Sequence, residues 1–359
     1  MRLGFRCWTS AAAMFAVISC CRIAPNADIV WSHVAQVASG DVRYDQGVSA
    51  MYAASVGGVL LIAGGANFPD TPVADGGKKA FYDYIYMYDG DWRCIGRLPG
   101  PAAYGVSYSC GSGAVFAGGS NKEGAVRSVY MVEIEAGMAK VSELALLPCA
   151  IEQAAGTSID GRLYLFGGIA DGTPSASLFL LDTNIDGAEW QTLAPAPEPF
   201  VQPVAAASGG RLYVWGGFDP STKSVGGHGY CYDPQHNEWS KVAGHPDGGT
   251  FTGSCALTLT DGRILFVGGV DREIFSDALQ LSADKIREYQ KQPVEAYRFQ
   301  QALHIFDPVS GEWSSAGESE CAARAGASLM ALDGAIYLLG GELKPGIRTS
   351  ENFRTTMIN

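Results

Sequence analysis

Residues 338–349 read Leu338-Leu339-Gly340-Gly341-Glu342-Leu343-Lys344-Pro345-Gly346-Ile347-Arg348-Thr349. An apolar run reaches a glycine pair, and a carboxylate, an ammonium, a Pro-Gly turn and a guanidinium follow it. Similar apolar runs precede five other glycine pairs, which begin at Gly64, Gly118, Gly167, Gly216 and Gly268. The chain therefore contains six copies of one repeat, and only the sixth copy carries this set of charged residues.

The spacing of the glycine pairs predicts the fold. Most pairs are about 50 residues apart, the period of kelch repeats, in which each repeat forms one four-stranded blade of a β-propeller. In the third copy we expect strands at 153–158, 162–166, 178–182 and 190–193. The predicted fold class is all-β, a six-bladed kelch-type β-propeller. Tryptophans expected to pack between its blades are Trp92, Trp190, Trp239 and Trp313.

The sixth copy has room for a third strand, expected at 354–358, but not for a fourth. An unpaired sheet edge would be a liability. Residues 29–34 resemble the fourth strands around Trp239 and Trp313, so we expect the N-terminal strand to complete the last blade and close the ring. The long interval before the sixth glycine pair contains residues 277–301, which are rich in helix formers. They predict a short helical insertion between the second and third strands of blade five.

Composition argues against a nucleic-acid partner and against a metal site or cofactor. The chain has 37 Asp and Glu against 25 Lys and Arg, and it contains no long basic run, so a nucleic-acid partner is not expected. The cysteines beyond the N-terminal region are widely separated, and the five histidines are scattered. We therefore expect buried free thiols, no metal site and no cofactor.

The N-terminus predicts export. Residues 1–24 combine early arginines, a short apolar core and small residues, as a signal peptide does, and the core is too short to span a membrane. Val17-Ile18-Ser19-Cys20 resembles a bacterial lipoprotein box, which leaves two alternatives: an outer-membrane lipoprotein anchored at Cys20, or a soluble periplasmic protein cleaved near Ala24. Residues 25–359 would form a single propeller domain, as a monomer or weak dimer.

Polar residues gather where a propeller places its loops. The segments after the glycine pairs and those entering the first strands are expected on one face, around the central channel. A phenol, amides, an acid and a guanidinium there suit the hydroxyl groups of a sugar. An alternative is that Arg324, Gln153 and Gln202 satisfy loop backbone groups. The candidate substrate-binding residues are Asn67, Tyr104, Gln153, Gln202, Asp271 and Arg324.

A family resemblance becomes specific at the charged motif. Residues 340–349, together with Gly64-Gly65-Ala66-Asn67-Phe68-Pro69 and Ala316-Gly317-Glu318-Ser319, resemble the N-acetylneuraminate epimerase (sialic acid mutarotase) family of kelch propellers. The likeness covers nearly all of the mature chain, but in a rotated order, because the motif lies mid-chain in better-known members. The chain thus resembles the cyclically permuted branch, and permutation leaves the site of a closed ring intact.

The resemblance implies a catalytic pair and a sugar-acid substrate. The family's functional Glu and Arg correspond to Glu342 and Arg348. Mutarotation opens and recloses a hemiketal ring, which one carboxyl group acting as base and acid can accelerate, so Glu342 is the candidate for that group. Arg348 is the candidate for binding the sugar carboxylate, with Lys344 as a weaker contact. The alternative is a surface ion pair on a loop.

Three other functions compete with this one. A non-catalytic glycan-binding or protein-binding propeller is the main alternative, because fold alone does not fix function. A sialidase would carry repeats of Ser-x-Asp-x-Gly-x-x-Trp, which the sequence lacks. A copper radical oxidase would need converging histidines, which the scattered positions do not favour.

Overall fold

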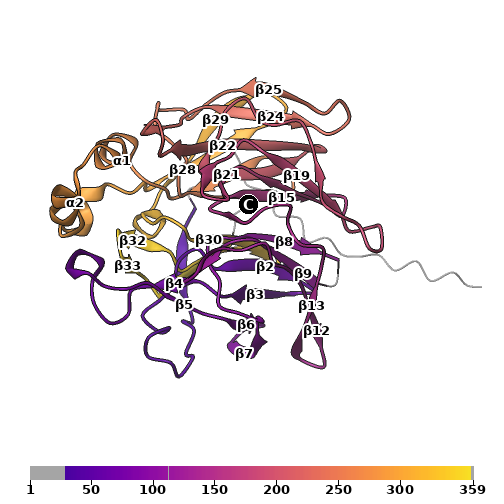
Figure 1. The fold of residues 1–359 in the computed structure, drawn as a ribbon, viewed down its shortest axis with the longest axis horizontal. Helices are drawn as coiled ribbons and strands as arrows, with labels where there is room; N and C mark the ends of the chain where they lie inside the picture. The colour runs from indigo at the N-terminus through magenta and orange to yellow at the C-terminus, as the bar shows by residue number, and fades with distance from the viewer. Residues whose placement is uncertain (1–28, 112, 357–359) are drawn as a thin grey trace, which may run out of the picture.

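The structure is a computed structural model that describes residues 29–111 and 113–356 (Figure 1). Within these residues the chain is mainly β-strand with few helices, so the predicted all-β class is confirmed at this level. The predicted signal peptide and Cys20 lie outside the described residues.

Six antiparallel sheets, each with four main strands, follow one another along the chain. Sheet one contains β2 (Tyr52–Val56), β3 (Val59–Ala63), β6 (Tyr84–Tyr88) and β7 (Trp92–Arg97). Sheet two contains β8 (Val106–Cys110), β9 (Gly113–Ala117), β12 (Val129–Glu135) and β13 (Met138–Glu143). Sheet three contains β15 (Ala155–Ile159), β16 (Arg162–Phe166), β19 (Leu178–Asp182) and β20 (Gln191–Thr192). Sheet four contains β21 (Val201–Ser208), β22 (Arg211–Asp219), β24 (Gly229–Asp233) and β25 (Glu238–Val242). Sheet five contains β26 (Cys255–Thr258), β27 (Ile264–Val267), β28 (Ala302–Asp307) and β29 (Glu312–Glu318). Sheet six contains β30 (Ser328–Leu332), β31 (Ala335–Leu339), β34 (Asn352–Thr356) and β1 (Trp31–Val34).

Each second strand is a nearly continuous apolar run because both of its faces are covered. In β3, Leu60 and Ile62 pack in one cluster with Tyr337 of sheet six. The alternate residue Leu61 packs with Phe116 of sheet two. Side chains alternate between the two faces of a strand, so an apolar residue at every position indicates a sheet with neighbours on both sides.

Tryptophans join consecutive sheets at all four predicted positions: Trp313 of sheet five packs against Trp215 of sheet four, with ring centres 5.7 Å apart, and the other three also form hydrogen bonds. The indole N–H groups of Trp92, Trp190 and Trp239 donate to backbone carbonyls at 2.8, 2.9 and 2.9 Å. The acceptors follow the outer strand of the preceding sheet: Ala35, Ala145 and Ala194.

The glycine pairs fit tight junctions between sheets. Gly340 and Gly341 have φ of 56° and 104°, which favour glycine. The Gly341 N–H donates to the carbonyl of Val48 at 3.0 Å, just before sheet one. A Cβ on Gly340 would lie 2.7 Å from the same carbonyl oxygen. The backbone of sheet six therefore approaches that of sheet one too closely for any other residue.

The first and last strands of the described residues share a sheet. β1 pairs antiparallel with β34, with Trp31 opposite Thr355. The predicted third strand of the last copy is observed as β34, which begins at Asn352, two residues early. The first strands also contact one another in sequence, and β30 contacts both β26 and β2.

Short hairpins replace the expected loops after most glycine pairs. Backbone pairing within each hairpin fixes the direction in which the residues after the glycine pair project from the sheet. The hairpins are β4 (Ala66–Asn67) with β5 (Ala80–Phe81), β10 (Ser120–Asn121) with β11 (Gly124–Ala125), β17 (Ile169–Ala170) with β18 (Thr173–Pro174), and β32 (Glu342–Lys344) with β33 (Ile347–Arg348). In addition, β14 (Ile151–Glu152) pairs with β17, and β23 (Ser224–Val225) pairs with β22.

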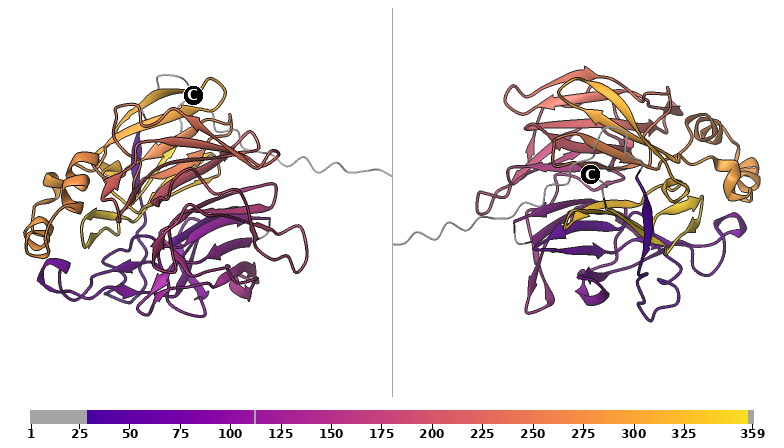
Figure 2. Two further views of the ribbon diagram at one scale, coloured as in Figure 1. Left: turned by 45° about the horizontal axis from the view of Figure 1, so that its top comes forward. Right: turned by 180° about the vertical axis from the view of Figure 1, so that it is seen from behind.

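Helices lie between β27 and β28, where the fifth copy is long. α1 (Arg272–Leu279) begins before the predicted segment, because the Asp271 carboxylate accepts the Ile274 N–H and caps the helix. Figures 1 and 2 show the helices at the same edge of the molecule as the β32–β33 hairpin. The remaining helical elements are α2 (Ala283–Gln290), η1 (Val73–Asp75), η2 (Val294–Tyr297) and η3 (Glu320–Ala322).

A buried histidine lies in sheet five. His304 is 7% exposed, and its ring contacts His245, Phe251 and Trp313. Burial, with a smaller contribution from His245, lowers the pKa of His304 to about 4, while Asp247 opposes the shift. The folded protein therefore holds this imidazole neutral at pH values where an exposed histidine is protonated.

We expect the free energy of unfolding to fall as the pH drops from about 6.5 to about 4. The unfolded chain binds a proton at His304 in that window and the folded chain does not, so acid favours unfolding. Urea titrations across this range measure the slope. His304→Phe, which keeps an aromatic ring, is expected to flatten it. Equal slopes for His304→Phe and the parent protein would contradict the assignment.

Candidate functional site

Backbone pairing fixes Glu342 at the start of the β32–β33 hairpin. Its N–H donates to the Ala325 carbonyl at 2.8 Å and its carbonyl accepts the Ala325 N–H at 2.9 Å. The carboxylate also contacts its own hairpin: Oε1 accepts the Gly346 N–H at 2.9 Å, and Oε2 lies 2.9 Å from Arg348 Nη1. The Pro-Gly turn thus positions the acid as well as reversing the chain.

Arg348 faces Glu342 across the hairpin, opposite it in register. Its side chain is only 4% exposed. Nε donates to the Ala66 carbonyl at 3.4 Å, Nη2 donates to the Tyr104 hydroxyl at 3.5 Å, and the guanidinium lies 5.6 Å from the centre of the Phe68 ring. Nη1 is buried and forms an ion pair with Glu342, but no hydrogen bond of good geometry to a described residue.

Six equivalent residues surround the centre of the molecule, each just before or at the start of a first strand. All adopt positive φ, between 54° and 72°, although four are not glycine. Left-handed conformations cost free energy in non-glycine residues and often occur at functional sites. The six residues, which we call the central ring, are Ala50, Tyr104, Gln153, Gln202, Gly253 and Gly326.

Backbone hydrogen bonds connect the central ring head to tail. The N–H of one member donates to the carbonyl of the member before it, at 2.8 or 2.9 Å, in five of the six junctions. At the sixth junction the Gly253 N–H makes no hydrogen bond to a described residue. This leaves one backbone donor for a ligand.

A central cavity of about 220 Å³ lies at this ring. All six ring members line it, and so does Glu342. Four candidates from the sequence therefore meet in one cavity: Glu342, Tyr104, Gln153 and Gln202. The Gln202 amide donates to the Gln153 side-chain oxygen at 2.7 Å, which fixes the orientation of both amides. Arg348 reaches the cavity through its contacts with Glu342 and Tyr104.

Two other candidates are buried in the protein itself. Asn67 is 2% exposed, and its amide group donates to the carbonyls of Arg43 and Gly47 and accepts the Tyr82 hydroxyl. Arg324 is also 2% exposed and donates only to backbone carbonyls. Neither side chain lines the central cavity. Arg324 therefore has the alternative role considered from the sequence: it satisfies backbone groups of the protein.

The last two candidates contact the helical segment. Asp271 caps α1, and its carboxylate lies 3.3 Å from Arg298. The Lys344 ammonium donates to the Gln292 carbonyl at 2.6 Å. Lys344 therefore joins the hairpin to the residues after α2 rather than pointing into the central cavity.

Sequence reasoning missed three polar residues near the site. Ser49 and Ser254 line the central cavity, and Lys79 lies over the ring of Tyr104. The serines carry no sequence signal because serine is common in turns. Lys79 follows Gly76-Gly77 in the loop between η1 and β5, where lysine is usually solvated.

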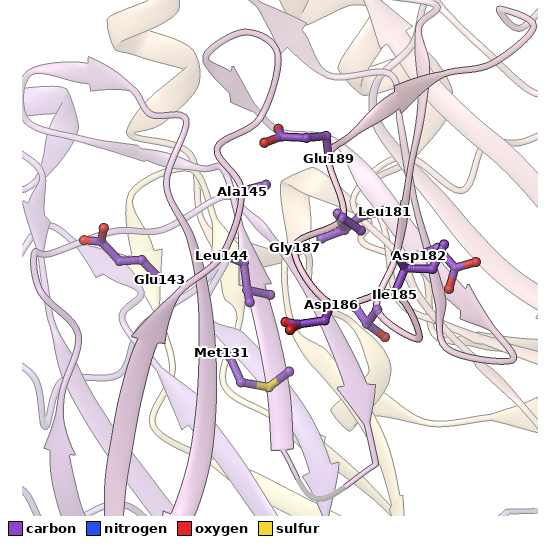
Figure 3. A pocket seen from close by; sticks show the side chains of 12 residues that line it. Met131, Glu143, Leu144, Ala145, Leu181, Asp182, Ile185, Asp186, Gly187 and Glu189 are labelled. Atoms are coloured by element: carbon purple, nitrogen blue, oxygen red, sulfur yellow. The ribbon is translucent and has the colours of Figure 1, made fainter.

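A second cavity, of about 390 Å³, lies at the outer end of sheets two and three (Figure 3). Glu143 comes from β13, and Asp186 and Glu189 come from the loop after β19. The Asp182 carboxylate at its edge pairs with Arg162 at 3.1 Å. None of the candidate residues lines it, so the acidic cavity is separate from the central one.

Other sequence expectations can be compared with the described residues. Cys94, Cys110, Cys149, Cys231, Cys255 and Cys321 are free, but only Cys231 is buried, so the expectation of uniformly buried thiols was wrong. No group of three or more metal-binding side chains occurs in the described part of the chain. The same part contains no helix long and apolar enough to cross a membrane.

The fold and the central cavity define a mainly β, propeller-like repeat protein with a paired acid and guanidinium. The family model for N-acetylneuraminate epimerase matches residues 17–141 and 144–359. The chain belongs to that family.

Individual relatives support the same family at modest identity. N-acetylneuraminate epimerase of Yersinia pestis (strain Pestoides F) is 30% identical over 220 residues, which cover 57% of this chain and 55% of the relative. That of Yersinia enterocolitica is 34% identical over 131 residues, 34% of this chain and 33% of the relative. The solved structure of YjhT superposes with a TM-score of 0.53 at 27% identity, covering 59% of this chain and 63% of YjhT. The chain thus aligns with about half the length of the first curated relative and a third of the second.

Proposed function

We propose that this protein is a sialic acid mutarotase, which interconverts the α and β anomers of N-acetylneuraminate. The observation that carries the proposal is the Glu342 carboxylate, which lines a central cavity while Arg348 and the Gly346 N–H hold it in place. Membership of the N-acetylneuraminate epimerase family supports the choice of substrate and reaction.

The proposed scaffold is a single six-bladed kelch-type propeller, residues 25–359, closed by the N-terminal strand and bearing the helical insertion. In such a propeller the ring closes through contacts between neighbouring sheets, and not through hydrogen bonds that run around one closed sheet. The pairing of β1 with β34 and the contact of β30 with β2 support it. The backbone hydrogen bond from Gly341 to Val48 supports it as well. The separate matches of 17–141 and 144–359 suit a cyclically permuted order.

In the proposed mechanism Glu342 moves one proton. Its carboxylate takes the proton of the anomeric hydroxyl as the carbonyl forms and the bond from the anomeric carbon to the ring oxygen breaks. The same carboxyl group returns the proton to the ring oxygen through a water molecule. The open-chain ketone can rotate and reclose on either face, by the same steps in reverse. Such acid-base assistance contributes about 10²- to 10⁴-fold to a reaction.

Arg348 has two proposed roles. Its ion pair holds the Glu342 side chain aimed at the cavity, and its guanidinium offers hydrogen bonds to the carboxylate on the anomeric carbon. Tyr104, Gln153 and Gln202 are proposed to bind sugar hydroxyl groups, because their polar groups lie around the same cavity. We propose an exported location, the periplasm or the outer membrane through Cys20, on the N-terminal sequence alone.

The test adds the purified protein to the pure α-anomer of N-acetylneuraminate and follows the anomeric signals by NMR. We expect the approach to equilibrium to accelerate at least tenfold over buffer, in proportion to protein concentration. A glycan-binding propeller without catalysis would leave the buffer rate unchanged, and that result would overturn the proposal. A fluorogenic sialoside should remain uncleaved, because the proposed reaction breaks no glycosidic bond.

A further inference from the structure

The charges in the central cavity are already balanced before a substrate binds. Glu342 and Arg348 form an ion pair at 2.9 Å, and the arginine side chain is almost fully buried. A sugar acid adds one more negative charge beside the Glu342 carboxylate. Two carboxylates close together in a partly buried site repel each other unless a second cation is present.

Lys79 is positioned to supply that cation. Its ammonium lies 4.4 Å from the centre of the Tyr104 ring, and Tyr104 lines the central cavity. The same ammonium lies 5.9 Å from the centres of the Phe68 and Phe81 rings. A cation over aromatic faces is held by their electron density without losing its charge.

Two aromatic residues connect Lys79 with Arg348. The Tyr104 ring contacts the lysine while its hydroxyl accepts from Arg348 Nη2 at 3.5 Å. The Phe68 ring lies within 5.9 Å of the ammonium and 5.6 Å of the guanidinium. Lys79 immediately precedes β5, which pairs with β4, and the Ala66 carbonyl of β4 accepts from Arg348. The two cations thus flank one aromatic surface.

The positive charge of Lys79 is not used elsewhere in the described residues. Lys291 pairs with Asp75, and Lys344 donates to the Gln292 carbonyl. Lys122 and Lys140 also have carboxylate partners. Lys79 contacts rings only, with no carboxylate or carbonyl partner within the described chain.

We propose that Lys79 binds the carboxylate of the sugar acid together with Arg348, and so sets the preference of the cavity for acidic over neutral keto sugars. This inference rests on the proposed function, because it names a residue that recognises the same substrate. Lys79 makes its contribution to binding rather than to proton transfer, which Glu342 performs.

The test compares Lys79→Gln, Lys79→Arg and the control Lys78→Gln, which removes the same charge from the exposed neighbouring residue. For N-acetylneuraminate we expect Lys79→Gln to raise the KM for anomer exchange roughly 10- to 100-fold, with kcat changed only a few-fold. Lys79→Arg should stay within a few-fold of the parent, as should Lys78→Gln. With the uncharged methyl ester, Lys79→Gln and the parent should have equal KM values.

The outcomes separate this inference from the proposed function. An active parent protein whose KM is the same in Lys79→Gln and Lys78→Gln would overturn the role of Lys79 alone. An equal loss with acid and ester would overturn it too, because the effect would not depend on the substrate charge. A parent that binds sialic acid by saturation-transfer NMR without accelerating exchange would refute the mutarotase proposal, while weaker binding by Lys79→Gln would still support Lys79. A parent that neither binds nor accelerates would refute both.

Discussion

Replacing Glu342 with glutamine is expected to lower kcat for sialic acid anomer exchange by about 10²- to 10⁴-fold. Glutamine has nearly the same shape, and its amide oxygen can still accept the Gly346 N–H. It cannot take the proton of the anomeric hydroxyl, and it no longer pairs with the Arg348 charge. Because the loss falls on proton transfer, KM should change much less than kcat. Anomeric NMR signals, followed over a range of substrate concentrations, measure both quantities.

Glu123→Gln is a matched control for this variant. Glu123 lies exposed at the turn of the β10–β11 hairpin, which corresponds to the β32–β33 hairpin in another repeat. The control removes the same charge and should keep the parental rate. Thermal unfolding should show that both variants remain folded. A Glu342→Gln protein with the full rate would exclude Glu342 as the acid-base group, whatever family the chain belongs to.

Repetition made the architecture predictable from the sequence. An apolar run that ends in a glycine pair indicates two local features: a buried second strand, and a close approach between two backbones. The six copies place these features in the same order, so the sheets could be located before their contacts were known. Strands predicted at 162–166 and 178–182 coincide with β16 and β19.

The pairing of Glu342 with Arg348 was predictable for a different reason. Both residues belong to one short segment with a Pro-Gly turn between them, so local geometry alone brings them together. The structure adds the partners that local sequence cannot show, such as the Tyr104 hydroxyl and the Ala66 carbonyl, which are far away in the chain.

Burial separated the other candidates in a way that the sequence could not. Asn67 follows a second strand and Gln153 precedes a first strand, two positions expected on the same face, yet every polar group of the Asn67 amide has a partner in the protein. Gln153 has one side-chain partner and lines the cavity. The central ring was also hidden, because alanine, tyrosine and glutamine give no sign of positive φ.

Replacing Arg324 with methionine is expected to lower the free energy of unfolding by about 3–5 kcal/mol. Methionine keeps the apolar stem but removes the donors that reach the carbonyls of Cys321, Gly340 and Glu351 at 2.7, 2.7 and 3.0 Å. Burial lowers the pKa of Arg324, but its ordinary pKa is so high that the group stays charged at neutral pH. The variant thus leaves three backbone acceptors without their charged donor, and urea unfolding measures the cost.

Arg354→Met separates this burial effect from a general loss of positive charge. Arg354 is an exposed residue of β34 in the same sheet, and its replacement should change stability by no more than about 0.5 kcal/mol. Arg324 directly precedes Ala325, whose backbone holds Glu342, so kcat of the folded Arg324→Met protein should also fall. A stable Arg324→Met protein with a raised KM and a normal kcat would instead indicate that Arg324 binds the substrate, as the sequence first suggested.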